Sequence, residues 1–462
     1  MSLHSAFAAD LRLAALAVAL TAAPAPARAQ DRPATAPPPP QELAAVWDRE
    51  HVSSPLTPLV DHREVVSRLA ALRRDAPGLF TVREAGRSVE GRSINLVTAG
   101  DGAFRVLLWS QMHGDEPTAT AALFDVLEYL RRHRTEPVAA RILDTLTLHV
   151  IPMLNPDGAE RFQRRNAQGI DINRDALLLQ TPEGRALKNV RDEYEPSIGF
   201  NLHNQNWRTS VGRAPVKPAS ISLLSVAFDA ARTQNEGRLL TKKTCAIIRD
   251  AIEPLAPGQI GRYDDEFEVR AFGDNITLWG TPVVLIETGP FSAREPDPAL
   301  VRMNFVAILT ALDALATGRV HLADPQRYES LPENDSRLFH TLIRRASIVT
   351  GSGVAPFTGD IGITATRRVR MVDGRRRVAL VMGIEDLGDL RVFAGLEEID
   401  ASGKVVAPIF APNLAEGQEV RLPDELHVAR PLGVGQPAAL LLLEPTGRIP
   451  GKYRILRIVR GD

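Results

Sequence analysis

The chain has 462 residues, of which 44% are hydrophobic, so it can bury a large core and has the length of two or more domains. Its 55 lysine and arginine residues balance 56 aspartate and glutamate residues, and the net charge is -1. This balance argues against a protein that binds nucleic acid by neutralising phosphates, and it favours a small or peptidic partner. The single cysteine, Cys245, excludes an intramolecular disulfide and a thiolate zinc cluster.

The N-terminal segment predicts export. Residues 11–23 form an apolar, alanine-rich run, and Ala27-Arg-Ala29 follows as an A-x-A cleavage site. We therefore expect a signal peptide over residues 1–29, cleaved after Ala29, and a secreted or periplasmic protein. The run is too short to span a bilayer, and no stable membrane insertion is expected after cleavage. The proline-rich residues 30–44 predict an extended linker.

Residues 45–320 alternate between helical and strand patterns. Asp61 is a suitable N-cap for a helix with Val65, Leu69 and Leu72 on one face. Further helices are expected from Pro117, around 238–252 and near 297–316, and apolar strands at 104–110, 146–153, before His203 and at 282–287. This order predicts an α/β fold with a mostly parallel sheet covered by helices on both faces. Ligands of such sheets bind beyond the carboxyl ends of the strands.

Metal-competent side chains follow these strand ends. His113 and Glu116 form an H-x-x-E motif directly after the strand at 104–110, and His203 ends a later strand. Two imidazoles and one carboxylate make a three-ligand zinc site with one position left open, as catalytic zinc requires. Glu287 follows five apolar residues, where a carboxylate is costly to bury without a partner or a task. It is a candidate general base.

A loop rich in hydrogen-bond donors lies between the H-x-x-E motif and His203. It contains Asn155-Pro-Asp-Gly158 and the stretch from Arg164 to Asp175, which reads R-x-N-x-x-G-x-D-x-N-R up to Arg174. Such a loop can grip an anionic group.

The order of these motifs, together with G-x-S-x-E-G-R-x-I at residues 86–94, resembles the zinc metallocarboxypeptidase family. The resemblance covers about residues 45–320. It implies a mixed, mostly parallel sheet sandwiched by helices, and one Zn²⁺ per chain held by His113, Glu116 and His203. It also implies hydrolysis of a peptide with a free C-terminus, with Glu287 as the base.

The resemblance extends to substrate-binding residues. Arg164 matches the residue that stabilises the oxyanion, although its neighbour Arg165 leaves the register ambiguous by one. Asn173 and Arg174 match the clamp on the terminal carboxylate of the substrate, which a planar guanidinium suits. Two further matches are a subsite arginine, Arg92, and a mobile tyrosine, Tyr263.

Residues 321–462 have a different pattern. Short β-branched runs separated by turns, with Asp373-Gly374 at one bend, predict β-hairpins. The segment resembles the accessory β-sandwich of amidohydrolases, but the histidine pair expected after it is absent. We therefore expect a C-terminal β-sandwich domain without a second active site.

Other functions fit the same motifs. A zinc deacylase of N-acyl amino acids uses similar H-x-x-E and N-R elements, and a cell-wall peptide hydrolase would act on D-amino acids. A catalytically silent zinc-binding recognition module is the alternative from outside enzymes. The presence of Glu287 and Arg164 argues against a silent module, which needs neither a base nor an oxyanion donor.

Overall fold

The structure is a computed structural model that describes residues 37–53, 59–294, 297–423, 426–447 and 450–461. The expected signal peptide, and the expected linker up to residue 36, lie outside the described residues. From residue 37 on, the chain forms one compact unit that contains two large sheets.

The first sheet has eight strands in the order β1-β2-β4-β3-β5-β10-β8-β9. Its centre, β4-β3-β5-β10, is parallel, whereas β2 runs antiparallel to β1 and β4, and β8 runs antiparallel to β10. The strands are β1 (Phe80–Arg87), β2 (Ser93–Ala99), β3 (Phe104–Ser110), β4 (Leu146–Ile151), β5 (Ile198–Asn204), β8 (Ile221–Ser225), β9 (Ile260–Arg262) and β10 (Val283–Thr288).

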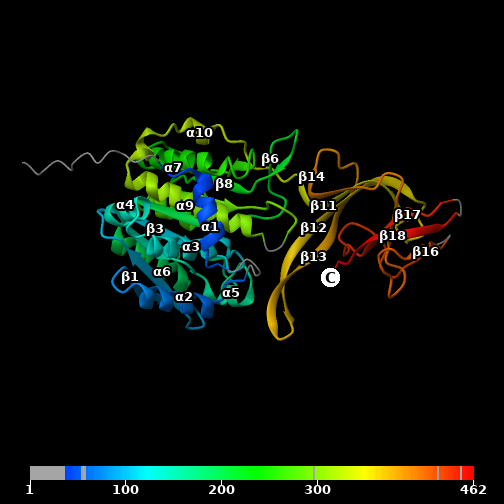
Figure 1. Cartoon of the computed structure of the whole chain (residues 1–462), viewed down its shortest axis with the longest axis horizontal. Coiled ribbons are helices and arrows are strands. Elements are labelled where there is room, and N and C mark those ends of the chain that lie inside the picture. Colours follow the sequence, from blue (N-terminus) through cyan, green and yellow to red (C-terminus); the bar gives the residue numbers. More distant parts are fainter. Residues whose placement is uncertain (1–36, 54–58, 295–296, 424–425, 448–449, 462) are drawn as a thin grey trace, which may run out of the picture. The chain divides into compact units, whose positions relative to one another are not determined.

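Helices cover both faces of this sheet (Figure 1). The larger core cluster joins one face to the helices α1 (Pro40–Glu50), α2 (His62–Asp75), α3 (Thr118–Arg132), α4 (Pro137–Thr145), α7 (Glu236–Ile252) and α9 (Pro298–Ala316). The smaller cluster joins the opposite face to α6 (Pro182–Tyr194) and α8 (Phe272–Leu278). The predicted mixed, mostly parallel sheet between helices is confirmed.

The side chains of β3, β5 and β10 alternate between these two clusters, as the two-residue period of a strand requires. Val106 and Leu108 belong to the larger cluster, and Leu107 and Trp109 to the smaller one. The alternation explains why continuous apolar runs mark the central strands, since both faces are buried. It also determines which strand-end residues share a face with α8.

Helix α9 is long and apolar enough to span a membrane by composition, with a mean hydropathy of 1.6. However, 78% of that window is buried, and α9 packs against α1, α3 and α7. Among the described residues it is therefore a core helix.

Helix α1 begins at Pro40, inside the segment 30–44 that the composition predicted to be a linker. Leu43, Ala44 and Trp47 are buried in the larger cluster, and proline is tolerated in the first turn of a helix. Asp125 of α3 anchors the chain that follows, because it accepts hydrogen bonds from Trp47 Nε1 and from the backbone of Ser53. The sequence analysis missed this helix because it weighed the proline content of the segment above the helical spacing of these three apolar residues.

Several short elements lie between the longer helices and strands. They are α5 (Pro156–Arg161), η1 (Ile172–Arg174), β6 (Ser210–Val211) and β7 (Lys217–Pro218), and later η2 (Arg319–Leu322) and α10 (Gln326–Glu329). Strands β6 and β7 pair with each other as a separate two-stranded sheet.

The C-terminal part is β-rich, as predicted. Its eight strands form one hydrogen-bonded sheet in the order β13-β12-β11-β15-β17-β18-β16, with β14 paired to β11. A single apolar cluster combines residues of β11 to β13 with residues of β15, β17 and β18. The strands are β11 (Leu338–Ile348), β12 (Phe357–Val372), β13 (Arg375–Gly388), β14 (Ala394–Asp400), β15 (Val405–Pro408), β16 (Glu419–Arg421), β17 (Leu440–Pro445) and β18 (Lys452–Val459).

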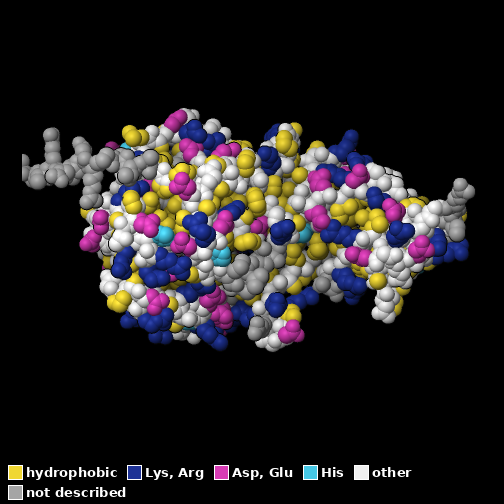
Figure 2. Space-filling model, viewed as in Figure 1, with side chains coloured by type: hydrophobic (Ala, Val, Ile, Leu, Met, Phe, Trp, Pro, Cys, Tyr) yellow, Lys and Arg dark blue, Asp and Glu magenta, His cyan; other side chains and the backbone are white. Residues whose placement is uncertain are grey.

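Charged side chains of both signs are interspersed over the face of the molecule in Figure 2. This distribution agrees with the near-zero net charge of the sequence.

Candidate active site

Two neighbouring strand ends place His203 and Glu287 side by side. The residues are Cα partners in the parallel pair β5 and β10, and both follow the alternation that faces α8. Both are buried, with 2% and 8% exposure. Because the carboxyl ends of parallel strands meet at one edge of the sheet, residues 84 positions apart in the chain reach one site.

The H-x-x-E motif lies in the loop between β3 and α3, next to His203. Glu116 bridges the two imidazoles, with Oε1 2.8 Å from His113 Nδ1 and Oε2 2.8 Å from His203 Nδ1. The two Nδ1 atoms are 3.1 Å apart. All three side chains are buried, and their ligand atoms lie within 4.8 Å of one another.

This cluster fits zinc. Nitrogen and oxygen ligands about 2.0 to 2.2 Å from a tetrahedral zinc ion lie about 3.3 Å from one another. The 2.8 to 3.1 Å between these donor atoms is slightly shorter, so a small outward shift accommodates the ion. The two histidines and the carboxylate predicted as ligands are therefore brought together. The structure supplies three protein ligands, which is the number that catalytic zinc sites use.

Charged neighbours bias the protonation of the cluster. Burial alone would raise the pKa of Glu116, but His113 and His203 outweigh it and lower that pKa far below its ordinary value. Burial lowers the pKa of the His203 imidazole, which keeps the ring neutral. An ionised carboxylate and a neutral imidazole are the forms that bind zinc. For His113, burial lowers the pKa, but Glu116 and Asp171 outweigh it and raise that pKa to about 9, so this ring must lose a proton when zinc binds.

Asp171, which the sequence analysis did not assign, orients His113. The Nε2–H of His113 donates to Asp171 Oδ1 at 3.1 Å, on the side of the ring away from Glu116. A carboxylate in this place fixes the tautomer of a metal-binding histidine. Its second oxygen accepts a hydrogen bond from Arg164 Nε at 3.0 Å. The signal in the sequence was the Asp inside the R-x-N-x-x-G-x-D-x-N-R stretch.

Arg164, rather than its neighbour, reaches the cluster. Its Nη1 lies 3.5 Å from Glu116 Oε1, 45% of its side chain is exposed, and it lines the pocket. Arg165 points away and donates to the carbonyl of Gly169. The geometry thus resolves the one-residue ambiguity in favour of Arg164.

The N-P-D-G motif has a structural task. Asn155 Nδ2 donates to the carbonyls of Met112 and Arg164 and so ties the metal loop to the arginine loop. Gly114 packs against Gly158 so closely that a Cβ on Gly114 would lie 2.0 Å from the carbonyl carbon of Gly158. The backbone of Gly158 therefore leaves no room for a side chain at position 114.

Arg92 is not brought to the site. Its Nη1 pairs with the buried Asp157 at 2.6 Å and with Glu90, and it does not line the pocket. Asp157 also accepts hydrogen bonds from Ser88 Oγ and from the backbone of Glu90. The G-x-S-x-E-G-R segment is therefore fastened to the N-P-D-G turn, and Arg92 serves this attachment.

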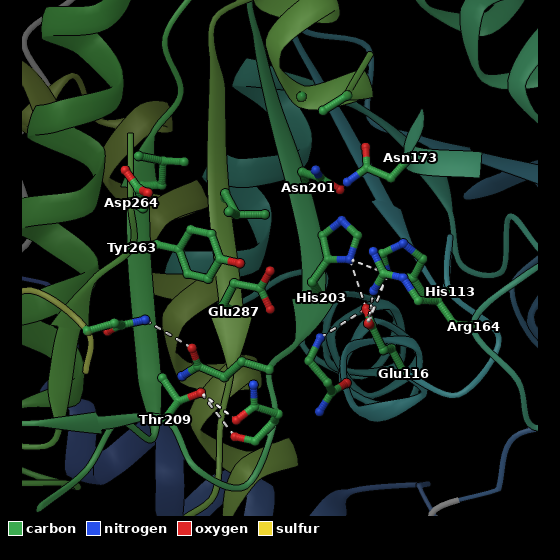
Figure 3. A pocket seen from close by; sticks show the side chains of 18 of the residues that line it. His113, Glu116, Arg164, Asn173, Asn201, His203, Thr209, Tyr263, Asp264 and Glu287 are labelled. Atoms are coloured by element: carbon green, nitrogen blue, oxygen red, sulfur yellow. Dashed lines mark hydrogen bonds and ion pairs between the residues drawn. The ribbon is translucent and has the colours of Figure 1, made fainter. Parts of the chain in front are cut away.

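Glu287 stands beside the cluster without a hydrogen-bond partner for Oε2 among the described residues. Burial, followed by the negative charge of Glu116, raises its pKa above the ordinary value. Tyr263 follows β9, and its hydroxyl points toward Glu287 (Figure 3). Glu287 and burial raise the pKa of Tyr263 to about 12, so the phenol stays protonated.

Asn173 and Arg174 also line this pocket. Asn173 Oδ1 accepts the backbone N–H of Phe272, which holds η1 against α8. Arg174 is exposed, and its Nε lies 3.3 Å from Glu268. All but one of the residues proposed from the sequence thus line one pocket: His113, Glu116, Arg164, Asn173, Arg174, His203, Tyr263 and Glu287.

Parts of this chain are similar to known proteins. Residues 65–220 match the sequence model of the family described as zinc carboxypeptidase. Carboxypeptidase 2 of Trichophyton rubrum is 33% identical over 146 residues, which cover 31% of this chain and 26% of that protein. The human carboxypeptidase N catalytic chain is 29% identical over 140 residues, which cover 26% of this chain and 30% of that protein. The chain therefore spans less than a third of the length of these relatives.

A solved metallo-carboxypeptidase from Burkholderia cenocepacia is similar at a TM-score of 0.44 and 20% identity, over 56% of this chain and 70% of that one. The family match contains His113, Glu116 and His203, the three residues whose ligand atoms converge in the structure. Residues 65–220, the segment that holds this cluster, are therefore similar to the zinc carboxypeptidase family.

Proposed function

We propose that this protein is a zinc-dependent carboxypeptidase that hydrolyses the C-terminal peptide bond of peptides. The observation that carries the proposal is the convergence of His113, Glu116 and His203 beside a buried carboxylate, Glu287, whose Oε2 has no partner among the described residues. A ligand cluster alone would serve a binding protein. A neighbouring base with a raised pKa supports hydrolysis.

In this proposal His113, Glu116 and His203 hold the zinc. Zinc, when bound, supplies a Lewis acid that polarises a carbonyl and makes water more acidic. Glu287 accepts a proton from the attacking water at Oε2 and then delivers it to the leaving amine. Arg164 lies beside the ligand cluster, so its guanidinium can stabilise negative charge that develops on the carbonyl oxygen.

Arg174 and Asn173 are proposed to hold the terminal carboxylate of the substrate. Both line the pocket, and the exposed guanidinium of Arg174 forms an ion pair with Glu268 of the same pocket. The bound carboxylate would fix the scissile bond one residue away from the clamp. Tyr263, on the other side of Glu287, is proposed to close over the substrate.

The proposal is tested with pairs of peptides that differ only in a free or an amidated C-terminus, with zinc removed by a chelator and then restored. Losing a charge-assisted pair in a partly desolvated site costs about 2 to 5 kcal/mol, which is roughly 30-fold to several-thousand-fold in kcat/KM. We expect poor cleavage of the amidated peptides. Arg174→Ala should reduce the difference in kcat/KM between the free and the amidated peptide.

The exposed Arg391, which pairs with Asp389 in the C-terminal sheet, gives the control variant Arg391→Ala. This variant should keep the full difference in kcat/KM between the peptide with a free C-terminus and the amidated peptide. Equal cleavage of both peptides by the unmodified enzyme, or release of internal fragments, would refute the carboxypeptidase assignment. Cleavage of N-acyl amino acids without cleavage of peptides would instead indicate a deacylase.

We also propose that the protein is exported, because residues 11–29 have the pattern of a cleaved signal peptide. N-terminal sequencing of the mature protein from the periplasm or the medium tests this. A mature N-terminus at Gln30 is expected, and retention of Met1 in the cytoplasmic fraction would contradict it.

A further inference from the structure

A row of three side chains forms the floor of the pocket below the proposed catalytic residues. Asn201 of β5, Leu285 of β10 and Leu224 of β8 are Cα partners across three neighbouring strands. Asn201 and Leu285 each stand two residues before His203 and Glu287, so they share their face of the sheet. All three residues line the pocket. A side chain that enters beyond the scissile bond therefore meets this row.

Most of the floor is apolar. Leu224 and Leu285 are each 7% exposed, and Val226 extends the same wall. Helix α8 presents Gly273 to the row, and a Cβ at this position would lie 3.3 Å from Asn201 Nδ2. The glycine thus leaves space beside the amide of Asn201 that a larger residue would crowd.

Asn201 is the polar exception in this row. It is 97% buried, and its Oδ1 has no hydrogen-bond partner in the part of the chain that the structure describes. Figure 3 shows the amide of Asn201 next to Asn173 and above the ring of His203. Buried polar atoms in proteins are nearly always paired, so an unpaired amide oxygen beside a pocket marks a position where a polar group of a ligand can bind.

The chemistry of that partner follows from the surroundings. A carboxamide can donate to Asn201 Oδ1 and accept from Nδ2, so it satisfies both ends of the amide. A thioether or aliphatic side chain of the same size leaves the amide unpaired. A carboxylate group would lose its hydration between Leu224, Val226 and Leu285 without a positive charge in the row. An ammonium group would lose its hydration as well, and burial raises the pKa of Asp274, the carboxyl after Gly273 in the pocket lining, to about 7, so its charge is only partly formed at neutral pH.

We propose that Asn201 selects the side chain of the residue that is released, and that the pocket favours an uncharged carboxamide side chain, that of glutamine or asparagine. This inference rests on the proposed carboxypeptidase function. It assigns a substrate class to the same site, with Leu224, Val226 and Leu285 as the apolar walls that surround the amide.

The test uses four peptides that differ only in their C-terminal residue, which is Gln, Met, Glu or Lys. Glutamine and methionine have nearly the same length, so their ratio isolates the polar contact. We expect kcat/KM for Gln to exceed that for Met about 10-fold or more, because one buried polar group is left unpaired in the Met complex. The Glu and Lys peptides should be cleaved more slowly than the Gln peptide.

Asn201→Leu replaces the amide with an apolar group of similar size, and Asn201→Ala removes it. Each variant should lower the Gln to Met ratio to one or below. Leu224→Val changes the wall and keeps the amide, so the ratio should remain above one. The ranking of the four peptides by the unmodified enzyme tests the inference even if a variant does not fold.

The outcomes separate the two proposals. If all peptides are cleaved but Met equals or exceeds Gln, or if Glu or Lys ranks first, the inference about Asn201 is wrong and the carboxypeptidase function stands. If no free C-terminus is cleaved by the zinc-loaded enzyme, both proposals fail.

Discussion

The Nε2 atom of His113 and the Oδ1 atom of Asp171 form a hydrogen bond of 3.1 Å, and this bond faces away from Glu116 and His203. It fixes the ring so that Nδ1 points to the other two candidate ligands. Asp171 is itself held, because Arg164 donates to its second oxygen. One carboxylate thus connects the proposed metal site to the proposed oxyanion-stabilising residue.

We expect Asp171→Asn to weaken zinc binding by about 10-fold to 100-fold without unfolding the chain, the usual effect of removing such a partner. The amide keeps the shape of the carboxylate but not its charge. Competition with a metal chelator measures the affinity. Asp389→Asn, which changes an exposed carboxylate in the C-terminal sheet, is the control and should leave affinity unchanged. Equal affinities for the Asp171 variant and the unmodified protein would remove Asp171 from the site.

His203→Ala should abolish stoichiometric zinc binding, because only two of the three converging ligands remain. Metal analysis of the purified variant gives the result, and circular dichroism checks the fold. His133→Ala is the matched control, since this histidine pairs with Glu50 and Glu136 at the end of α3 and should not affect the metal. One zinc per chain in His203→Ala would show that the ligand set is wrong.

Glu287→Gln should keep the zinc and lower kcat by at least about 100-fold, the scale of general acid–base catalysis. The amide has the shape of the carboxylate but cannot take up the proton. Steady-state kinetics with a peptide substrate measure the loss. Glu333→Gln, an exposed carboxylate paired with Arg262, should turn over normally. Near-normal kcat in Glu287→Gln would require another base.

The sequence predicted the residues at strand ends better than those in loops. His203 and Glu287 could be found because each ends an apolar run, and parallel strands bring such ends together. Asp171 and Asn201 were missed for different reasons. The partner of Asp171 lies 58 positions away, and Asn201 looks like an interruption of an apolar strand until the register places it beside Leu285.

Arg92 shows the opposite error. It matched a family motif, but its charge is taken up by Asp157 and Glu90, a pairing that spacing in the sequence does not reveal. Helix α1 was missed for another reason, because its first residues lie in a proline-rich segment that was interpreted as a linker.

The pKa of Asp274 predicts a pH-dependent contribution to stability. Burial raises this pKa from 3.8 to about 7, while one oxygen accepts the backbone N–H of Glu268. Because the folded-state pKa lies above the unfolded value, the contribution is fully present below about pH 3.8 and is lost as the pH rises through about 7. The loss at alkaline pH is at most about 4 kcal/mol.

Asp274→Asn removes this titration and keeps an acceptor for the N–H of Glu268. We therefore expect the Tm of the variant, relative to the unmodified protein, to rise between pH 5 and pH 8. Thermal melts of both proteins with saturating zinc measure the difference, and Asp389→Asn provides the baseline for an exposed carboxylate. A Tm difference that is constant with pH would contradict the assignment.

The boundary between the catalytic part and the β-rich part was expected at residue 320 or 321, and we now propose that it lies between Leu331 and Leu338. Tyr328 is 3% exposed and belongs to the larger core cluster, and its hydroxyl accepts the backbone N–H of Ser225. Asn334 bonds to Gln205 and Ser222, next to the proposed active site. These contacts tie residues 326–336 to the first sheet.

Two truncated chains test this boundary. A chain that ends after Arg337 keeps Tyr328 and Asn334, so it should bind zinc and unfold cooperatively. A chain that ends after Ala323 loses the buried Tyr328 ring, and truncation of a buried aromatic residue alone costs about 3 to 5 kcal/mol. It should have a much lower Tm or be insoluble. Equal behaviour of the two chains would contradict the proposed boundary, because removal of residues 324–337 would then cost nothing.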